Sequence, residues 1–134
     1  MNLDLHLRIL GVLLTLLAFV HLGFPRFLGW RDQLKALSLL NRQIMQIHTL
    51  FIALTVLLMG LLCLGSASEL SRTALGRRVA LGMSFFWLVR LACQFFAYSP
   101  ELWRGKRVET IIHILASLLW LDLTATLLFA GLSG

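Results

Sequence analysis

The chain has 134 residues and a net charge of +6, but charged residues make up only 13% of it. Soluble globular domains carry about 25% charged residues, and the mean hydropathy of +0.87 also excludes an ordinary soluble domain. The basic residues lie in short segments between apolar runs, so they form no aqueous basic face for nucleic acid. We therefore predict a single membrane domain, residues 1–134, with the lipid bilayer as its main partner.

Four apolar runs are long enough to cross a membrane, which takes about 20 apolar residues. They cover residues 5–24, 44–64, 79–98 and 108–132. The first run has no small-x-small cleavage pattern and should be a retained helix that breaks at Pro25. Because the runs are continuous rather than alternating, they favour helices. The sequence thus predicts an all-α, integral membrane bundle of four transmembrane helices.

The segments between the runs differ in character. Leucines recur at helical spacing among polar residues in 31–43, which predicts an amphipathic lead-in that continues into the second span as one long helix. We expect residues 66–78 to form a short polar loop. The segment 99–107 holds Trp103 beside three basic residues, a composition typical of an interfacial anchor.

The distribution of Lys and Arg predicts the orientation. Seven lie in the first and third loops with the lead-in, and four lie at the N-terminus and in the second loop. Because basic residues favour the cytoplasmic side, the first and third loops should be cytoplasmic and both termini outside. The expected location is the bacterial inner membrane.

Each of the four spans carries a polar side chain at a similar depth. With a rise of about 1.5 Å per residue, these side chains lie about 5 to 8 Å from the side of the first and third loops. They are His21, His48, Gln94 and His113. Polar groups inside a bilayer are costly, so each is a candidate functional residue.

Spacings of three and four residues place further polar and aromatic residues on the same helix faces. The stripes are Trp87, Arg90, Gln94 and Tyr98 on the third helix; Glu109, His113, Ser117, Trp120 and Thr124 on the fourth; and Asn41, His48, Thr55 and Met59 on the second. We expect all three stripes to point into the bundle, because exposure to lipid would be costly.

The charge of Arg90 requires a partner, because Arg90 lies about 12 Å deep and cannot lose its proton. We predict an ion pair with Asp122, the only carboxylate deep in a span, or with Glu109. By contrast, we expect His6 to be interfacial and inert.

Together these residues predict a cofactor site, made of His21, His48, Arg90, Gln94, Tyr98 and His113. The histidines His21, His48 and His113 could hold a metal ion, and two histidines could ligate a haem. A quinone or a lipid headgroup could instead form hydrogen bonds to His, Gln, Tyr and Arg. A histidine near an interface is, however, more often a residue that joins two helices. Motifs for di-iron, hydrolase or nucleotide chemistry are missing from the sequence.

A family resemblance also indicates a site for a cofactor or a metal ion. The stretch His21-Leu22-Gly23-Phe24-Pro25-Arg26-Phe27, followed by Asn41-Arg42-Gln43 and His48, resembles the first two helices of the membrane protoporphyrinogen oxidase HemJ and of the copper-resistance D group. Those families place a histidine before a Pro-Arg-Phe element and bind haem or metal in a helical bundle. The pattern is also similar to small uncharacterised bacterial four-helix membrane proteins. The resemblance assigns no catalytic residue.

Three functions fit the sequence. The first is a redox or electron-transfer protein with a haem, metal or quinone-like cofactor in one leaflet. The second is a non-catalytic subunit of a larger membrane complex, with membrane-protein partners or further copies of itself. The third is a small transporter or channel, in which Arg90 would line an anion path. Whether the protein is an enzyme stays open.

Overall fold

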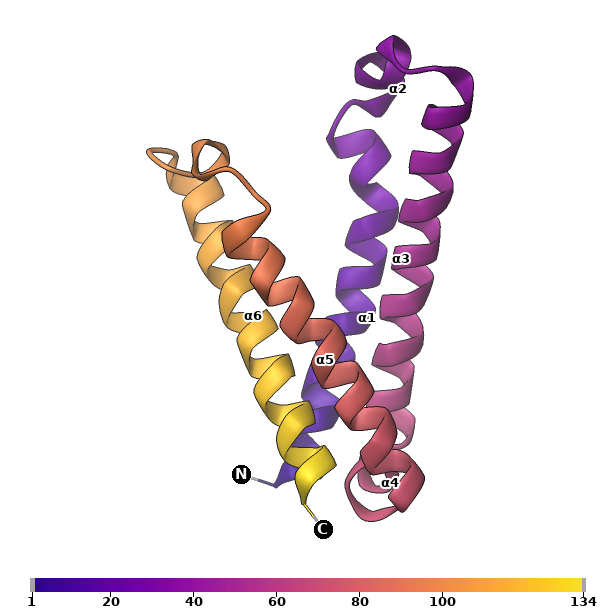
Figure 1. Cartoon of the computed structure of the whole chain (residues 1–134), viewed down its shortest axis with the longest axis vertical. Coiled ribbons are helices and arrows are strands. Elements are labelled where there is room, and N and C mark those ends of the chain that lie inside the picture. Colours follow the sequence, from indigo (N-terminus) through magenta and orange to yellow (C-terminus); the bar gives the residue numbers. More distant parts are fainter. Residues whose placement is uncertain (1, 134) are drawn as a thin grey trace. The chain divides into compact units, whose positions relative to one another are not determined.

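The computed structural model describes residues 2–133, which are almost entirely helical. Its four long helices are α1 (Leu3–Phe27), α3 (Leu39–Gly65), α5 (Ala74–Phe96) and α6 (Arg107–Leu132) (Figure 1). Each is long and apolar enough to cross a membrane. The predicted all-α class with four transmembrane helices is confirmed.

The chain divides into two compact units. One unit, here the α1–α3 unit, is Arg8–Ser66. The other, here the α5–α6 unit, combines Met1–Leu7 with Ala67–Gly134. The first turn of α1 therefore belongs with helices that come much later in the chain. The single domain over residues 1–134 stays a prediction.

In the α1–α3 unit two antiparallel helices approach closely at a pair of glycines. A Cβ atom on Gly11 would lie 2.8 Å from the carbonyl oxygen of Gly60, and one on Gly60 would lie 2.8 Å from Thr15 Oγ1. Small residues allow such close approach of membrane helices. At one end of the pair, Arg8 Nη1 donates a hydrogen bond of 2.7 Å to the Leu64 carbonyl, one of the last carbonyls of α3.

Further along this pair, α1 and α3 leave a small groove with almost purely apolar walls. The residues that line it are Ala18, Phe19, Leu22, Leu50, Ala53, Leu54 and Leu57. No titratable or hydrogen-bonding side chain is among them. Van der Waals contact therefore dominates the packing in this part of the unit.

The lead-in forms separate short helices rather than one long helix. Two short helical turns, α2 (Trp30–Gln33) and the 3₁₀ helix η1 (Leu34–Ala36), follow α1. The backbone is then extended at Leu37, and Ser38 caps α3 by accepting a hydrogen bond of 3.3 Å from the Asn41 amide. Only residues 39–43 of the lead-in extend the second span. The Ser38 cap explains the break. The serine side chain satisfies the Asn41 amide, which in a continuous helix would bond to a backbone carbonyl of the preceding turn.

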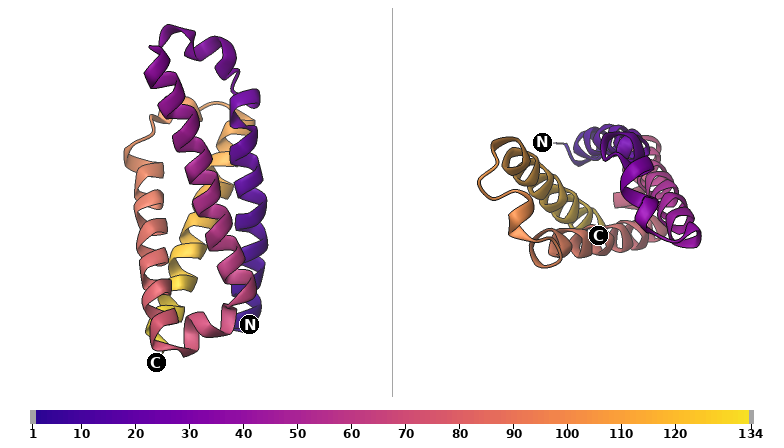
Figure 2. Two further views of the ribbon diagram at one scale, coloured as in Figure 1. Left: turned by 90° about the vertical axis from the view of Figure 1, so that its right-hand side faces the viewer. Right: turned by 90° about the horizontal axis from the view of Figure 1, so that it is seen from above.

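In the α5–α6 unit, α5 and α6 form a hairpin whose helices run side by side (Figure 2). A short 3₁₀ helix, η2 (Pro100–Leu102), lies in the connection. Inside the hairpin, the Ser84 hydroxyl donates a buried hydrogen bond of 2.8 Å to the Thr124 carbonyl. The helix pair is thus joined by a direct polar contact as well as by packing.

The segment before α5 corrects the predicted polar loop over residues 66–78. Residues Ala67–Arg72 form the helix α4, which packs on α5. Ala67, Leu70 and Ser71 are buried, so this short helix has an inner face. Thr73 then caps α5, because its hydroxyl accepts a hydrogen bond of 2.9 Å from the Gly76 amide. This cap lets α5 begin at Ala74, five residues earlier than predicted.

Candidate functional site

The polar stripe predicted on α5 leads into a hydrogen-bonded chain. Arg90 Nη1 donates a hydrogen bond of 3.0 Å to Gln94 Oε1, one helical turn further on. Gln94 is only 8% exposed, and its Nε2 lies 2.8 Å from Nδ1 of His113 on α6. The three side chains therefore form one relay, here the Arg90–Gln94–His113 relay, which joins the two helices.

The relay determines where His113 carries its proton. A guanidinium can only donate, so the atom of Gln94 beside Arg90 must be the amide oxygen. The amide nitrogen of Gln94 then faces His113, and it too can only donate. Nδ1 of His113 must accept this bond, which leaves the proton of the neutral imidazole on Nε2. His113 is thus a hydrogen-bond donor at Nε2.

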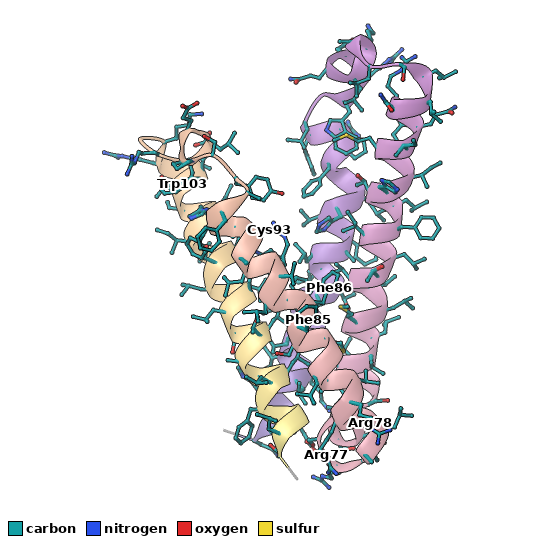
Figure 3. All side chains as sticks on the ribbon, viewed as in Figure 1. Arg77, Arg78, Phe85, Phe86, Cys93 and Trp103 are labelled. Atoms are coloured by element: carbon teal, nitrogen blue, oxygen red, sulfur yellow. The ribbon has the colours of Figure 1, made fainter. Side chains whose placement is uncertain are left out.

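Aromatic rings fix the position of the imidazole. The Trp103 indole stacks on His113 with ring centroids 4.3 Å apart and planes 13° apart. The Phe95 ring meets His113 edge-on at 5.8 Å. The Trp103 carbonyl accepts a hydrogen bond of 2.6 Å from the Thr110 hydroxyl, which ties the connection to the start of α6. Figure 3 shows Trp103 at this end of the hairpin, far along it from Arg77.

Arg90 also has aromatic neighbours. Its Cζ lies 5.1 Å from the ring centroid of Trp120 and 5.5 Å from that of Tyr98. Trp120 in turn stacks on Trp87 with centroids 4.9 Å apart and planes 13° apart. Such contacts attract a cation to the ring face. Two aromatic faces and one amide oxygen therefore surround the guanidinium.

The predicted ion pair of Arg90 with Asp122 or Glu109 is wrong. Among residues 2–133, no carboxylate lies within ion-pair distance of Arg90. The helical period gives the reason. Trp120 faces Arg90, and a residue two positions further on points about 200° away around the helix, so Asp122 faces elsewhere. Glu109 is exposed in the first turn of α6.

Asp122 instead binds a residue that we expected to be inert. Nε2 of His6 lies 2.9 Å from Asp122 Oδ1 and 3.1 Å from Oδ2. The depth of His6 in the sequence predicts a histidine near the membrane surface that has no functional role. The structure brings the first turn of α1 against the middle of α6, and no sequence pattern within either helix predicts that contact.

Three indole N–H groups near the Arg90–Gln94–His113 relay have no hydrogen-bond partner among the described residues. They belong to Trp87, Trp103 and Trp120, and each nitrogen is buried. Buried donors are normally paired, so each of these three nitrogens departs from the usual pattern. The composition of the segment 99–107 predicts that Trp103 is an interfacial anchor. Its role beside His113 depends on the conformation of the connection, in which Gly105 adopts a positive φ of 78°.

The other two predicted site histidines lie in the α1–α3 unit. Nδ1 of His21 donates a hydrogen bond of 2.9 Å to the Leu17 carbonyl, which leaves a lone pair on Nε2. His48 is exposed on α3, as is Asn41, so this end of the predicted α3 stripe does not face inward. Residues 2–133 include no group of three or more His, Cys, Asp or Glu side chains placed to hold a metal ion. The triad of His21, His48 and His113 stays a prediction.

Comparison with known proteins identifies no relative. No family model matches the chain, and neither a curated protein nor a solved structure matches it. The resemblance to HemJ and the copper-resistance D group stays a prediction.

Proposed function

We propose that the α5–α6 unit binds a quinone-like molecule, meaning a flat apolar ring with carbonyl oxygens. The observation that carries this proposal is the Arg90–Gln94–His113 relay. It presents an N–H donor at His113 Nε2 inside a helix that crosses the membrane. A carbonyl oxygen is the natural acceptor for such a donor. Quinone-like molecules also partition into the apolar phase that surrounds these helices.

The relay favours such an acceptor over a metal ion or a haem at His113. Metal coordination uses a lone pair on the imidazole nitrogen, but the relay places the proton of His113 on Nε2. Moving this proton to Nδ1 would make Nδ1 a donor facing the donor nitrogen of Gln94. Turning the Gln94 amide over would instead make its nitrogen face the Arg90 guanidinium, again donor against donor.

The surroundings suit a flat ligand whose oxygens gain negative charge on reduction. Trp103 and Trp120 place aromatic rings beside His113 and Arg90, and their indole N–H groups have no hydrogen-bond partner among residues 2–133. Arg90 supplies a positive charge that no carboxylate within residues 2–133 neutralises. A fixed positive charge in a medium of low dielectric stabilises developing negative charge more strongly than in water.

We assign the protein a redox or electron-transfer role on this basis. The ligand would receive its electrons from a membrane-protein partner that carries a redox centre, so the protein would act as a quinone-binding subunit. The bacterial inner membrane supplies both ligand and partner. With the orientation predicted from the Lys and Arg count, the site would open on the cytoplasmic side.

The experiment is a titration of the protein in nanodiscs with a benzoquinone that carries a ten-carbon tail. Tryptophan fluorescence reports binding, because Trp103 and Trp120 lie beside the relay. We expect saturable quenching in the wild type. The variants His113→Phe and Gln94→Leu should each weaken binding by about tenfold, which corresponds to about 1.4 kcal/mol.

The matched control is Phe96→Leu, an exposed position two residues after Gln94. It should bind as the wild type does. Equal affinities of the wild type and His113→Phe would refute the proposal. So would a Soret band, or a stoichiometric metal, that the purified wild type carries and His113→Phe lacks.

A further inference from the structure

A second polar cluster lies in the same unit, where the first turn of α1 meets α6. Nε2 of His6 is 2.9 Å and 3.1 Å from the two carboxylate oxygens of Asp122. The Thr126 hydroxyl, one turn further along α6, donates a hydrogen bond of 3.1 Å to Asp122 Oδ1. The His6 side chain is 20% exposed and that of Asp122 is 45% exposed.

The position of Asp122 makes a net charge on this pair unfavourable. Ten residues of α6 follow Asp122, so it lies roughly 15 Å from the end of the helix. A carboxylate at the centre of a transmembrane helix costs about 2.5 to 3.5 kcal/mol. The pair is neutral overall in two forms: imidazolium with carboxylate, and imidazole with carboxylic acid. Both forms contain one shared proton.

A neighbouring ion pair shows what is particular to His6 and Asp122. Asp4, two residues before His6, binds Arg72 of α4 with an Nη2 to Oδ2 distance of 3.2 Å. Arginine does not release its proton in proteins, so that pair has fixed charges. In the His6–Asp122 pair, either side chain can carry the proton, because imidazole and carboxylate both exist in protonated and unprotonated forms.

The charged groups on the surrounding helices do not compete for Asp122. On α4, Arg72 is bound to Asp4, and Glu69 is exposed and accepts a hydrogen bond from Ser68. At the start of α5, Arg77 Nη1 donates to the Arg72 carbonyl at 3.5 Å, and Arg78 is exposed. Further along α5, Arg90 donates to Gln94. Among the described residues, His6 is thus the titratable partner of Asp122.

We infer that His6 and Asp122 form a proton-binding site separate from the Arg90–Gln94–His113 relay. The site holds one proton, which can be bonded to either of two atoms that lie 2.9 Å apart, His6 Nε2 and Asp122 Oδ1. In one direction the bond from hydrogen to His6 Nε2 breaks and a bond from hydrogen to Asp122 Oδ1 forms, so the charge of the pair stays zero. His6 lies one turn from the beginning of α1 and Asp122 lies inside α6. The site therefore joins the first turn of α1 to the interior of α6 through one proton.

The inference is tested by infrared and nitrogen NMR titration of the wild-type protein in nanodiscs, with ¹³C-labelled aspartate and ¹⁵N-labelled histidine. We expect a carboxyl signal that disappears in Asp122→Asn. In the wild type, this signal and the imidazole signal of His6 should change in one common transition, because coupled groups titrate as a pair. Separate transitions of the two groups, or no carboxyl transition, would overturn the inference.

Two further variants sharpen the test. His6→Gln keeps a hydrogen-bond donor but cannot accept the proton, so the proton affinity of Asp122 should change by tenfold or more. Asp4→Asn is the matched control and should leave the common transition unaltered. An unchanged Asp122 transition in His6→Gln would contradict the inference. Quinone binding should stay as in the wild type in His6→Gln, so failure of this inference is distinguishable from failure of the proposed function.

Discussion

Two helix pairs of similar length and hydropathy hold together by different means. In the α1–α3 unit, the backbones approach at Gly11 and Gly60, and the groove beside them has apolar walls. In the α5–α6 unit, Gln94 reaches His113 across the hairpin, and Ser84 binds the opposite backbone. Lipid tails are as apolar as leucine, so membrane helices associate through close packing or through polar contacts. Close packing dominates in the α1–α3 unit, where Arg8 adds one polar contact at an end of the pair, whereas polar side chains join the two helices within the α5–α6 unit.

The histidines of the two units also differ in their surroundings. His113 is held between Gln94 and Trp103, with its proton directed to Nε2. His21 binds a carbonyl of its own helix, and His48 is exposed. Similar depth in the membrane therefore does not give these residues similar roles. The neighbouring helix decides whether a membrane histidine joins a network.

The largest expected effect is at the close approach of α1 and α3. The variant Gly11→Ile places a side chain against the Gly60 carbonyl and the Leu64 amide, and backbone atoms cannot move aside as side chains can. We expect the free energy of unfolding to fall by about 3 kcal/mol. Titration with SDS in mixed micelles measures it.

The control for this prediction is Gly82→Ile on α5, where a Cβ atom would meet nothing within 4 Å. It should change the free energy of unfolding by less than about 0.5 kcal/mol. Similar losses in Gly11→Ile and Gly82→Ile would show that backbone approach does not distinguish the two units.

A smaller effect is expected from the relay of the α5–α6 unit. The variant Gln94→Leu removes the partner of both Arg90 and His113 and leaves their polar groups unsatisfied. We expect a loss of about 1.5 kcal/mol in the same unfolding measurement. Phe96→Leu, on the exposed side of α5, is the control. A Gln94→Leu protein as stable as this control would mean that the relay serves binding alone.

The smallest effect is expected at the buried hydroxyl of Ser84. The variant Ser84→Ala removes the hydrogen bond to the Thr124 carbonyl. Hydrogen bonds between membrane helices contribute on average about 0.6 kcal/mol, and we expect a loss of that size. Thr49→Val is the counterpart in the α1–α3 unit, where the hydroxyl binds only the Met45 carbonyl of its own helix. A loss in Thr49→Val equal to that in Ser84→Ala would remove this difference between the units.

Several features of the protein follow from the sequence alone. Run length and hydropathy predict the four transmembrane helices, because a spanning helix must satisfy its backbone internally and expose apolar side chains to lipid. The helical period also predicts the stripe on α5 that contains Arg90 and Gln94. Both predictions depend on properties of one segment at a time. The residue types of the Ser38 and Thr73 caps are equally visible in the sequence. Leucine spacing alone extends the lead-in through Ser38, and run length alone starts the third span after Thr73.

The tertiary structure decided which segments meet. Periodicity gives the face and depth of a residue but not the helix that it contacts, so it pairs Asp122 with Arg90, whereas the structure pairs Asp122 with His6. In the same way, the stacking of Trp103 on His113 depends on how the connection folds back over the hairpin. The close approach of Gly11 and Gly60 depends on the pairing of two helices. Contacts between distant segments are properties of the packed chain, because each is fixed by the sum of many weak interactions on two surfaces at once.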